Sequence, residues 1–168
     1  MSPANNESPA TIGILTEFYN DKLASLLQHQ AHARFVEQYD ANNTYQYVIN
    51  REEVQLGWLA KAIMDAGATV PDTAPAPSTP SGRGKDAAHA LFEDDVRGAQ
   101  AFMDRWRPRV EGLDNARHRA MLRVILGETR EQQRFFEQAL AGRTDLLGRR
   151  TSAGDPARGD VLPARWIE

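Results

Sequence analysis

Two stretches decide the fold of this 168-residue chain: VINREEVQLGWL at residues 48–59 and VILGETREQQRF at residues 124–135. Each begins with Val-Ile, places a glutamate four residues after that valine, and ends on a large apolar residue. Adding 76 to a residue number in the first stretch gives its counterpart in the second, and the same offset relates Leu26 to Phe102. A pattern that recurs at a fixed offset indicates two matched structural units, here two helical hairpins.

The spacing of the apolar residues predicts an all-α protein. They recur at steps of three and four, typical of helices with one buried face, over four segments: about 10–38, 44–67, 86–107 and 115–141. Pro108 is expected to end or kink the third helix, Asp114 to cap the fourth, and Gly142 to end it. The short gaps within each pair, and a Pro- and Ser-rich stretch at 68–85, predict an antiparallel four-helix bundle with a long crossover between its second and third helices.

The bundle is expected to form one domain flanked by two less structured ends. Residues 1–9 are predicted to be a disordered N-terminus, 10–142 the bundle with 68–85 as its crossover linker, and 143–168 an extended C-terminal tail. The segment VLPARWI at 161–167 carries enough apolar area to dock on the bundle or on a neighbouring chain. We expect a homo-oligomer, namely a dimer.

Composition excludes several classes of function. The chain has no cysteine, which removes disulfides, thiolate metal sites and cysteine nucleophiles. Its charged residues, 26% of the chain, are of both signs and give a net charge of −3, so neither nucleic acid nor a membrane surface is an expected partner. There is no long apolar run or signal-like N-terminus, and a cytoplasmic location is expected. No phosphate-loop, dinucleotide or serine-hydrolase motif is found, so no catalytic or cofactor-binding residue is predicted from motifs.

Three glutamates lie on helix faces that the apolar residues mark as buried. Glu52 is at the centre of the apolar stripe of the second helix. Glu128 has the same place in the fourth helix, and Glu131 follows one turn later on the same side. An unpaired buried carboxylate costs several kcal/mol, so these groups need partners, protons or a cation.

The first and third helices offer a choice of register. Glu17 and Glu93 are related by the 76-residue offset, but Glu17 lies opposite the centre of its apolar stripe, and both are expected to face solvent. Tyr19 and Asp95, two residues further on, are in the middle of their stripes. This second register is the one that we predict.

The resulting set of positions resembles the ferritin-like dimetal carboxylate proteins of the rubrerythrin and bacterioferritin type. Those bundles place one Glu on each of two helices and Glu-x-x-His on each of the other two. The corresponding positions here are Tyr19, Glu52 with Gln55, Asp95, and Glu128 with Glu131. The resemblance covers about residues 10–141. It implies that these six residues form the metal site, with iron or manganese as the metal and, in an active site, dioxygen or peroxide chemistry.

The sequence also departs from that pattern. Gln55 and Glu131 replace both expected histidines, and Tyr19 replaces a carboxylate. Two interpretations therefore stay open: a modified site with mostly oxygen ligands, or a vestigial, metal-free site whose acids are held by protons or by polar neighbours. A further alternative is a non-enzymatic helical module that dimerises or docks a partner through its outer faces. Whether the protein is an enzyme is left undecided.

The histidines and tryptophans are expected to have structural roles. His29 and His32 have the i, i+3 spacing of a helical metal-ligand pair, but neither is at the centre of its stripe, so both are predicted to lie on the helix surface. His118 is about three turns from Glu128, too far to replace a missing ligand. Trp58 and Trp106 are expected at the edge and centre of their stripes as packing residues.

Overall fold

The computed structural model describes residues 7–73, 76–78, 84–144 and 146–147. These residues form four helices: α1 (Pro9–Ala33), α2 (Tyr39–Asp65), α3 (Lys85–Glu111) and α4 (Ala116–Leu140). None of them is long and apolar enough to cross a membrane. Residues 1–6 and 148–168, which carry most of the predicted disordered N-terminus and extended tail, lie outside the described residues.

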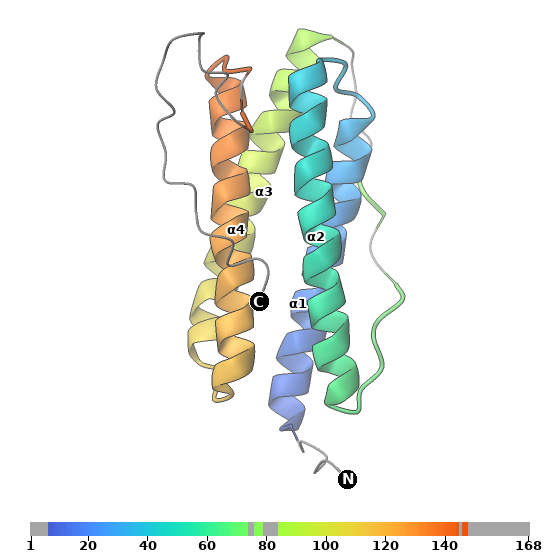
Figure 1. Ribbon diagram of the computed structural model, residues 1–168, viewed down its shortest axis with the longest axis vertical. Helices are drawn as coiled ribbons and strands as arrows, with labels where there is room; N and C mark the ends of the chain where they lie inside the picture. Colours follow the sequence, from blue (N-terminus) through green and yellow to red (C-terminus); the bar gives the residue numbers. More distant parts are fainter. Residues whose placement is uncertain (1–6, 74–75, 79–83, 145, 148–168) are drawn as a thin grey trace, which may run out of the picture.

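The helices pack as two antiparallel hairpins placed side by side (Figure 1). α1 contacts α2, α3 contacts α4, and the hairpins meet through α1 against α3 and α2 against α4. The described parts of the crossover between α2 and α3 lie along the outside of the bundle, and α2 and α3 point the same way (Figure 1). This is the all-α, antiparallel four-helix arrangement that the sequence predicted.

The core fills the space between the four helices with aliphatic and aromatic side chains. Phe18 packs edge-on against Phe102 and Trp106, with ring centroids 5.2 Å and 4.8 Å apart. Tyr45 and Phe136 lie 5.2 Å apart further along the bundle. Such aromatic pairs add to the stabilisation that burial gives, by about 0.5–1.5 kcal/mol each. Between these two groups the core is polar, and this polar layer is the candidate site.

The turn between α1 and α2 lies several residues earlier than the prediction. α1 ends at Ala33 rather than near residue 38, and α2 already begins at Tyr39. Asn42, expected to lie in the turn, is inside α2, and its Nδ2 donates to the carbonyl oxygens of Ala33 and Val36 at 3.0 and 3.4 Å. Asn42 therefore stabilises the turn from within the first turn of α2. Capping rules do not predict this role.

The second hairpin also differs at its turn. α3 continues through Pro108 to Glu111 instead of ending there, because Trp106 and Val110 are fully buried on either side of the proline. The N-cap of α4 is Asn115, not Asp114, and its Oδ1 accepts from the backbone N–H groups of Arg117 and His118 at 3.0 and 3.1 Å. Gly142, at φ 83°, follows the end of α4 as expected.

Candidate core site

A lysine and a glutamate form an ion pair in the centre of the bundle. Lys22 of α1 is 1% exposed and Glu52 of α2 is 0% exposed, and Lys22 Nζ lies 3.0 Å from Glu52 Oε1. The ammonium also lies 3.5 Å from Thr129 Oγ1 on α4 and 5.3 Å from the centroid of the Phe102 ring on α3. Lys22 therefore contacts the other three helices.

His29 links this ion pair to a second buried acid. Its Nδ1 donates to Glu52 Oε2 at 2.8 Å, and its Nε2 lies 3.6 Å from Asp95 Oδ1 on α3. The three residues are all buried. The imidazole thus bridges two carboxylates that would otherwise repel each other across the core.

Asp95 has two further partners, and one of them leads to the surface. His32 Nδ1 donates to the Asp95 carboxylate at 2.9 Å, and the Tyr45 hydroxyl donates to Asp95 Oδ2. The other ring nitrogen of His32 lies 2.6 Å from Gln28 Nε2 and 3.7 Å from the half-exposed Asp94. Lys22, Glu52, His29, Asp95 and His32 thus form one continuous buried chain in which basic and acidic side chains alternate, which we call the core network.

The pKa values of the network follow from burial and from its internal charges. Burial acts to raise the pKa of Glu52, but the charges and hydrogen bonds of His29 and Lys22 outweigh it and hold the pKa below its usual value. Burial acts to lower the pKa of His29, but the Glu52 charge, the Glu52 hydrogen bond and the Asp95 charge together raise it. Burial, the Asp95 charge and the hydrogen bond to Asp95 raise the pKa of Tyr45, which keeps the phenol protonated. The charged forms of Glu52 and His29 stabilise each other.

A smaller polar cluster lies between α2 and α4. Arg51 Nη2 donates to Glu128 Oε1 at 2.5 Å, Arg51 Nε donates to Glu128 Oε2 at 3.3 Å, and Gln55 Nε2 donates to the same Oε2. Gln55 is buried, whereas the Arg51 and Glu128 side chains are 24% and 21% exposed. Glu128 is thus held by an arginine at the rim of the bundle and is no part of the core network.

The structure brings some of the predicted site residues together and separates others. Glu52, Gln55 and Asp95 are buried as predicted, and Glu17 and Glu93 face solvent as expected. The predicted inward position of Glu131 is wrong, because its side chain is exposed on the outer face of α4. Tyr19 is only partly buried, since Phe18 and Lys22 occupy the centre of the α1 stripe.

The error on α4 amounts to one residue of register. Each buried residue of α4 is reached by adding 77, not 76, to a buried residue of α2: Glu52 pairs with Thr129 (52 + 77) and Gln55 with Gln132 (55 + 77). One residue corresponds to about 100° of rotation on a helix, which turns Glu128 toward the rim and Val124 outward, to 51% exposed. The buried face of α4 includes Thr129, Gln132 and Gln133, so apolar residues alone do not locate its centre.

The predicted surface position of His29 and His32 is also wrong, since both side chains belong to the core. His29 is 9% and His32 is 1% exposed, although a surface position was predicted for them. A signal for the core network exists in α1: Leu15, Phe18, Lys22, Leu26 and His29 follow one another at steps of three and four. Counting Lys22 and His29 as members of that stripe, despite their polarity, would have located the site.

Solved structures with a similar architecture are known. No family model matches the chain, and no curated protein matches its sequence. Among solved structures it is similar to a conserved hypothetical protein, Rv2844, from Mycobacterium tuberculosis, with a TM-score of 0.68 and 16% identity over 80% of this chain and 99% of that one. It is also similar to Mycobacterium tuberculosis bacterioferritin BfrA, with a TM-score of 0.57 and 13% identity over 81% and 87% of the two chains. This chain has a ferritin-like fold.

The residues at the centre of this ferritin-like bundle do not fit a dimetal centre. The two positions expected to carry Glu-x-x-His hold Glu52 with Gln55 on α2 and Thr129 with Gln132 on α4. The ammonium of Lys22, next to Glu52, would repel a metal cation bound there. Within the part of the chain that the structure describes, no three His, Cys, Asp or Glu side chains are arranged to hold a metal ion. We therefore derive no chemical step through a metal.

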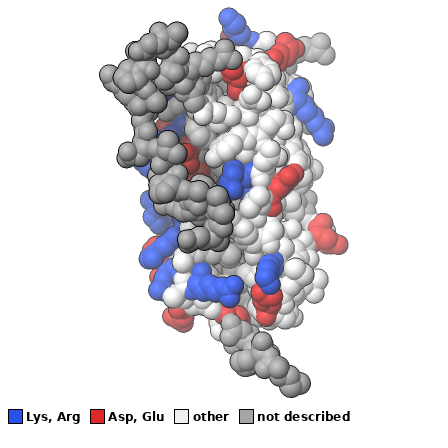
Figure 2. Space-filling model, viewed as in Figure 1, with Lys and Arg blue, Asp and Glu red and all other residues white. Residues whose placement is uncertain are grey.

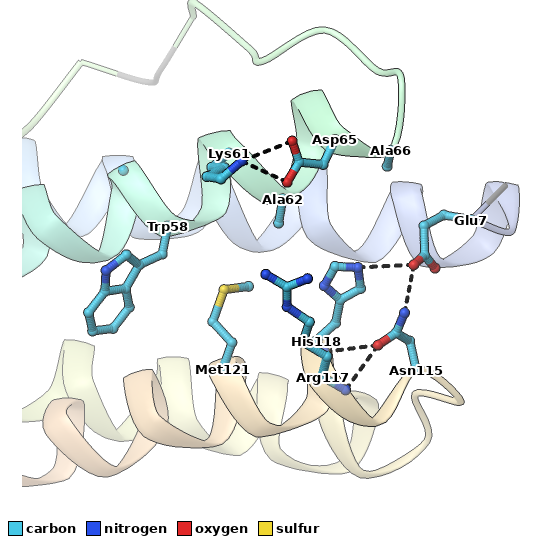
Figure 3. A pocket seen from close by; sticks show the side chains of 11 residues that line it. Glu7, Trp58, Lys61, Ala62, Asp65, Ala66, Asn115, Arg117, His118 and Met121 are labelled. Carbon is cyan, nitrogen blue, oxygen red and sulfur yellow. Dashed lines mark hydrogen bonds and ion pairs between the residues drawn. The ribbon is translucent and has the colours of Figure 1, made fainter. Parts of the chain in front are cut away.

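A separate pocket opens between the C-terminal end of α2 and the N-terminal end of α4 (Figure 3). Its cavity has a volume of about 370 Å³, and Trp58, Ala62 and Met121 supply apolar walls. Glu7 lies at one end, where Asn115 Nδ2 donates to its Oε1 at 2.6 Å and His118 Nε2 lies 3.2 Å from the same oxygen. This pocket has no contact with the core network.

Proposed function

We propose that this protein is a ferritin-like bundle with a vestigial dimetal site, and that it acts as a non-enzymatic helical module. The observation that carries the first part is the Lys22–Glu52 pair at 3.0 Å in the centre of the core. A fixed ammonium neutralises the carboxylate that would otherwise be a ligand of a divalent metal. The bundle then keeps the geometry of its relatives' fold without depending on iron or manganese for stability.

A gain-of-function experiment tests this role of Lys22. Lys22→Glu removes the ammonium and adds a carboxylate beside Glu52 and His29, which are ligands that divalent metals accept. We expect the variant to bind Co²⁺ with visible absorption bands, whereas the natural protein gives none. Lys61→Glu makes the same substitution at an exposed site on α2 and is the matched control. Equal Co²⁺ binding by the natural protein and by Lys22→Glu would contradict the proposal.

We further propose that the outer face of α2 and α4 binds a second copy of this chain. Tyr47, Val54 and Trp58 on α2 are 40%, 43% and 37% exposed, and Val124 on α4 is 51% exposed. The three α2 residues share one helix face, because Val54 and Trp58 follow Tyr47 by seven and eleven positions. Figure 2 shows mostly uncharged atoms over α2 on this side of the molecule. An exposed apolar band of this kind is typical of an interaction surface.

Side chains of the two helices already meet across this face. The Tyr47 and Phe135 rings lie 5.9 Å apart, and the Arg51 guanidinium lies 5.7 Å from the Trp58 ring. Together with the Arg51–Glu128 ion pair, these contacts fix the side chains of the exposed band. The band is apolar around this polar centre. A two-fold related copy would place the same band against itself, as isologous dimers do.

Analytical ultracentrifugation tests the dimer. We expect a dimer for the natural protein and a monomer for Trp58→Glu, because a charge within the band would be desolvated in the interface. Met64→Glu, at a residue that is 58% exposed but not part of the band, is the control and should leave the dimer intact. A monomeric natural protein would overturn this part of the proposal.

A further inference from the structure

A cavity between α1 and α3 leads from the surface to the core network. Its volume is about 260 Å³, and its walls come from all four helices. Small residues line it on both α1 and α3, namely Ala24, Ser25, Gly98 and Ala99. A Cβ atom added at Gly98 would meet no atom within 4 Å. A cavity of this volume is large enough to admit a small molecule.

Two buried polar atoms in the lining of this cavity have unused hydrogen-bonding capacity. Gln132 is 3% exposed, and its Nε2 donates to no partner among the described residues. Glu52 Oε1 has the Lys22 ammonium as its ion-pair partner at 3.0 Å, and a carboxylate oxygen can accept a second hydrogen bond. A buried donor such as Gln132 Nε2 is expensive to leave unpaired. One is a donor and the other an acceptor, so a complementary occupant offers an acceptor and a donor.

The charges around the cavity favour an uncharged occupant. Inside it, the positive charge of Lys22 faces Glu52, and His29, whose pKa is raised, faces Asp95. An added anion would lie near Glu52 and Asp95, and an added cation would lie near Lys22. Either ion would disturb pairs that are already balanced. Water could also occupy the space, since 260 Å³ is the share of roughly eight or nine water molecules in the liquid.

We propose that this cavity is a binding site for a compact, uncharged molecule of the primary-amide class. Its carbonyl oxygen accepts from Gln132 Nε2, and its N–H group donates to Glu52 Oε1. The inference rests on the proposed metal-independence of the core, because a metal held by Glu52 would occupy the same space. Metal analysis of the sample used for binding separates the failure of one proposal from the failure of the other.

Three probes of nearly equal shape test the charge preference: acetamide, acetate and acetamidinium. Each is titrated into the full-length, ¹⁵N-labelled protein while the Gln132 side-chain amide resonance is followed by NMR; Gln132→Leu identifies that resonance by its loss. We expect acetamide to shift the resonance saturably. Acetate and acetamidinium should bind at least about tenfold more weakly, because each leaves a buried group unpaired or meets a like charge.

Filling the mouth of the cavity tests its location. Gly98→Leu should abolish the acetamide-induced shifts, whereas Gly127→Leu, at an exposed α4 glycine that is not part of the cavity, should leave them unchanged. Thermal unfolding of both variants verifies that they fold, and if Gly98→Leu does not, Ala99→Leu at the same mouth replaces it. The proposal is overturned if acetamide gives no saturable shift, if the three probes bind equally, or if filling the mouth has no effect. The first of these outcomes would mean that the cavity holds water only.

Discussion

Lys22 of α1 and Glu52 of α2 form an ion pair at 3.0 Å while both side chains are almost completely buried. Two charges removed from water gain stability from each other only when each keeps the other as partner. The Lys22 ammonium thereby neutralises the charge of Glu52 inside this ferritin-like bundle without a bound cation.

Removing one member of the pair should cost more than removing both. Lys22→Met leaves Glu52 buried without its ammonium, and we expect the free energy of unfolding to fall by about 3–5 kcal/mol. The double variant Lys22→Met with Glu52→Leu replaces both charges by apolar groups and should recover most of that loss. Urea denaturation of the natural protein, both single variants and the double variant gives the coupling energy. Additive losses would show that the two side chains do not interact.

Substitution by alanine should lower the free energy of unfolding strongly at the buried Glu52 and hardly at the exposed Glu131. Glu52→Ala removes a buried carboxylate and isolates Lys22, so a loss of several kcal/mol is expected. Glu131→Ala acts at an exposed residue of α4 and should change stability by no more than about 0.5 kcal/mol. Similar losses for the two variants, measured by urea denaturation, would contradict the register of α4.

The hydroxyl of Tyr45 should matter because Asp95 depends on it. Tyr45 is fully buried and donates to Asp95 Oδ2, so Tyr45→Phe removes one of the donors to a buried carboxylate. We expect a loss of about 1–3 kcal/mol. Tyr39→Phe makes the same chemical change at a side chain that is 77% exposed, and thermal unfolding should detect no difference for it. Equal behaviour of the two variants would refute the assigned role of the hydroxyl.

The Glu52–His29 pair of the core network should be most stabilising in a defined pH window. The pKa of Glu52 is held below its usual 4.5, so its contribution is present above pH 4.5 and is lost as the pH falls through the folded pKa. The pKa of His29 is raised above its usual 6.5, so its contribution is present below pH 6.5 and is lost as the pH rises through the folded pKa. The Glu52–His29 pair therefore contributes most between pH 4.5 and 6.5.

A histidine variant isolates this effect from the other titrating groups. The free energy of unfolding, measured from urea curves across pH 4 to 9, should decline on the alkaline side of the window in the natural protein. His29→Gln should flatten that decline, because glutamine keeps a hydrogen bond to Glu52 but does not titrate. An alkaline limb that is identical in the two proteins would show that His29 carries no part of the pH dependence.

The sequence predicted the architecture well because the fold depends on features that recur locally. Apolar residues at three- and four-residue steps, glycines at helix ends and a proline-rich crossover were sufficient for four helices in the observed order. Helix ends were less well predicted where a single contact decides them. Asn42 ties the α1–α2 turn from inside α2, and Trp106 and Val110 carry α3 past Pro108.

The candidate site was predicted only in part because its buried faces are polar. The apolar stripe of α2 surrounds Glu52 and fixed it correctly, and the same held for Asp95 on α3. On α1 the residues that fill the site are Lys22, His29 and His32, which a hydrophobicity pattern assigns to the surface. Each is buried because it pairs with a charge on another helix, and such pairing between distant segments is invisible in local periodicity.

The metal content of the protein tests the central claim most directly. The chain is expressed in medium with iron and manganese, purified without chelator and analysed by inductively coupled plasma mass spectrometry. If the Lys22 ammonium occupies the place of a cation beside Glu52, each metal should be far below one equivalent per chain, in the natural protein and in Glu52→Ala alike. Near-stoichiometric iron or manganese in the natural protein that disappears in Glu52→Ala would contradict the claim.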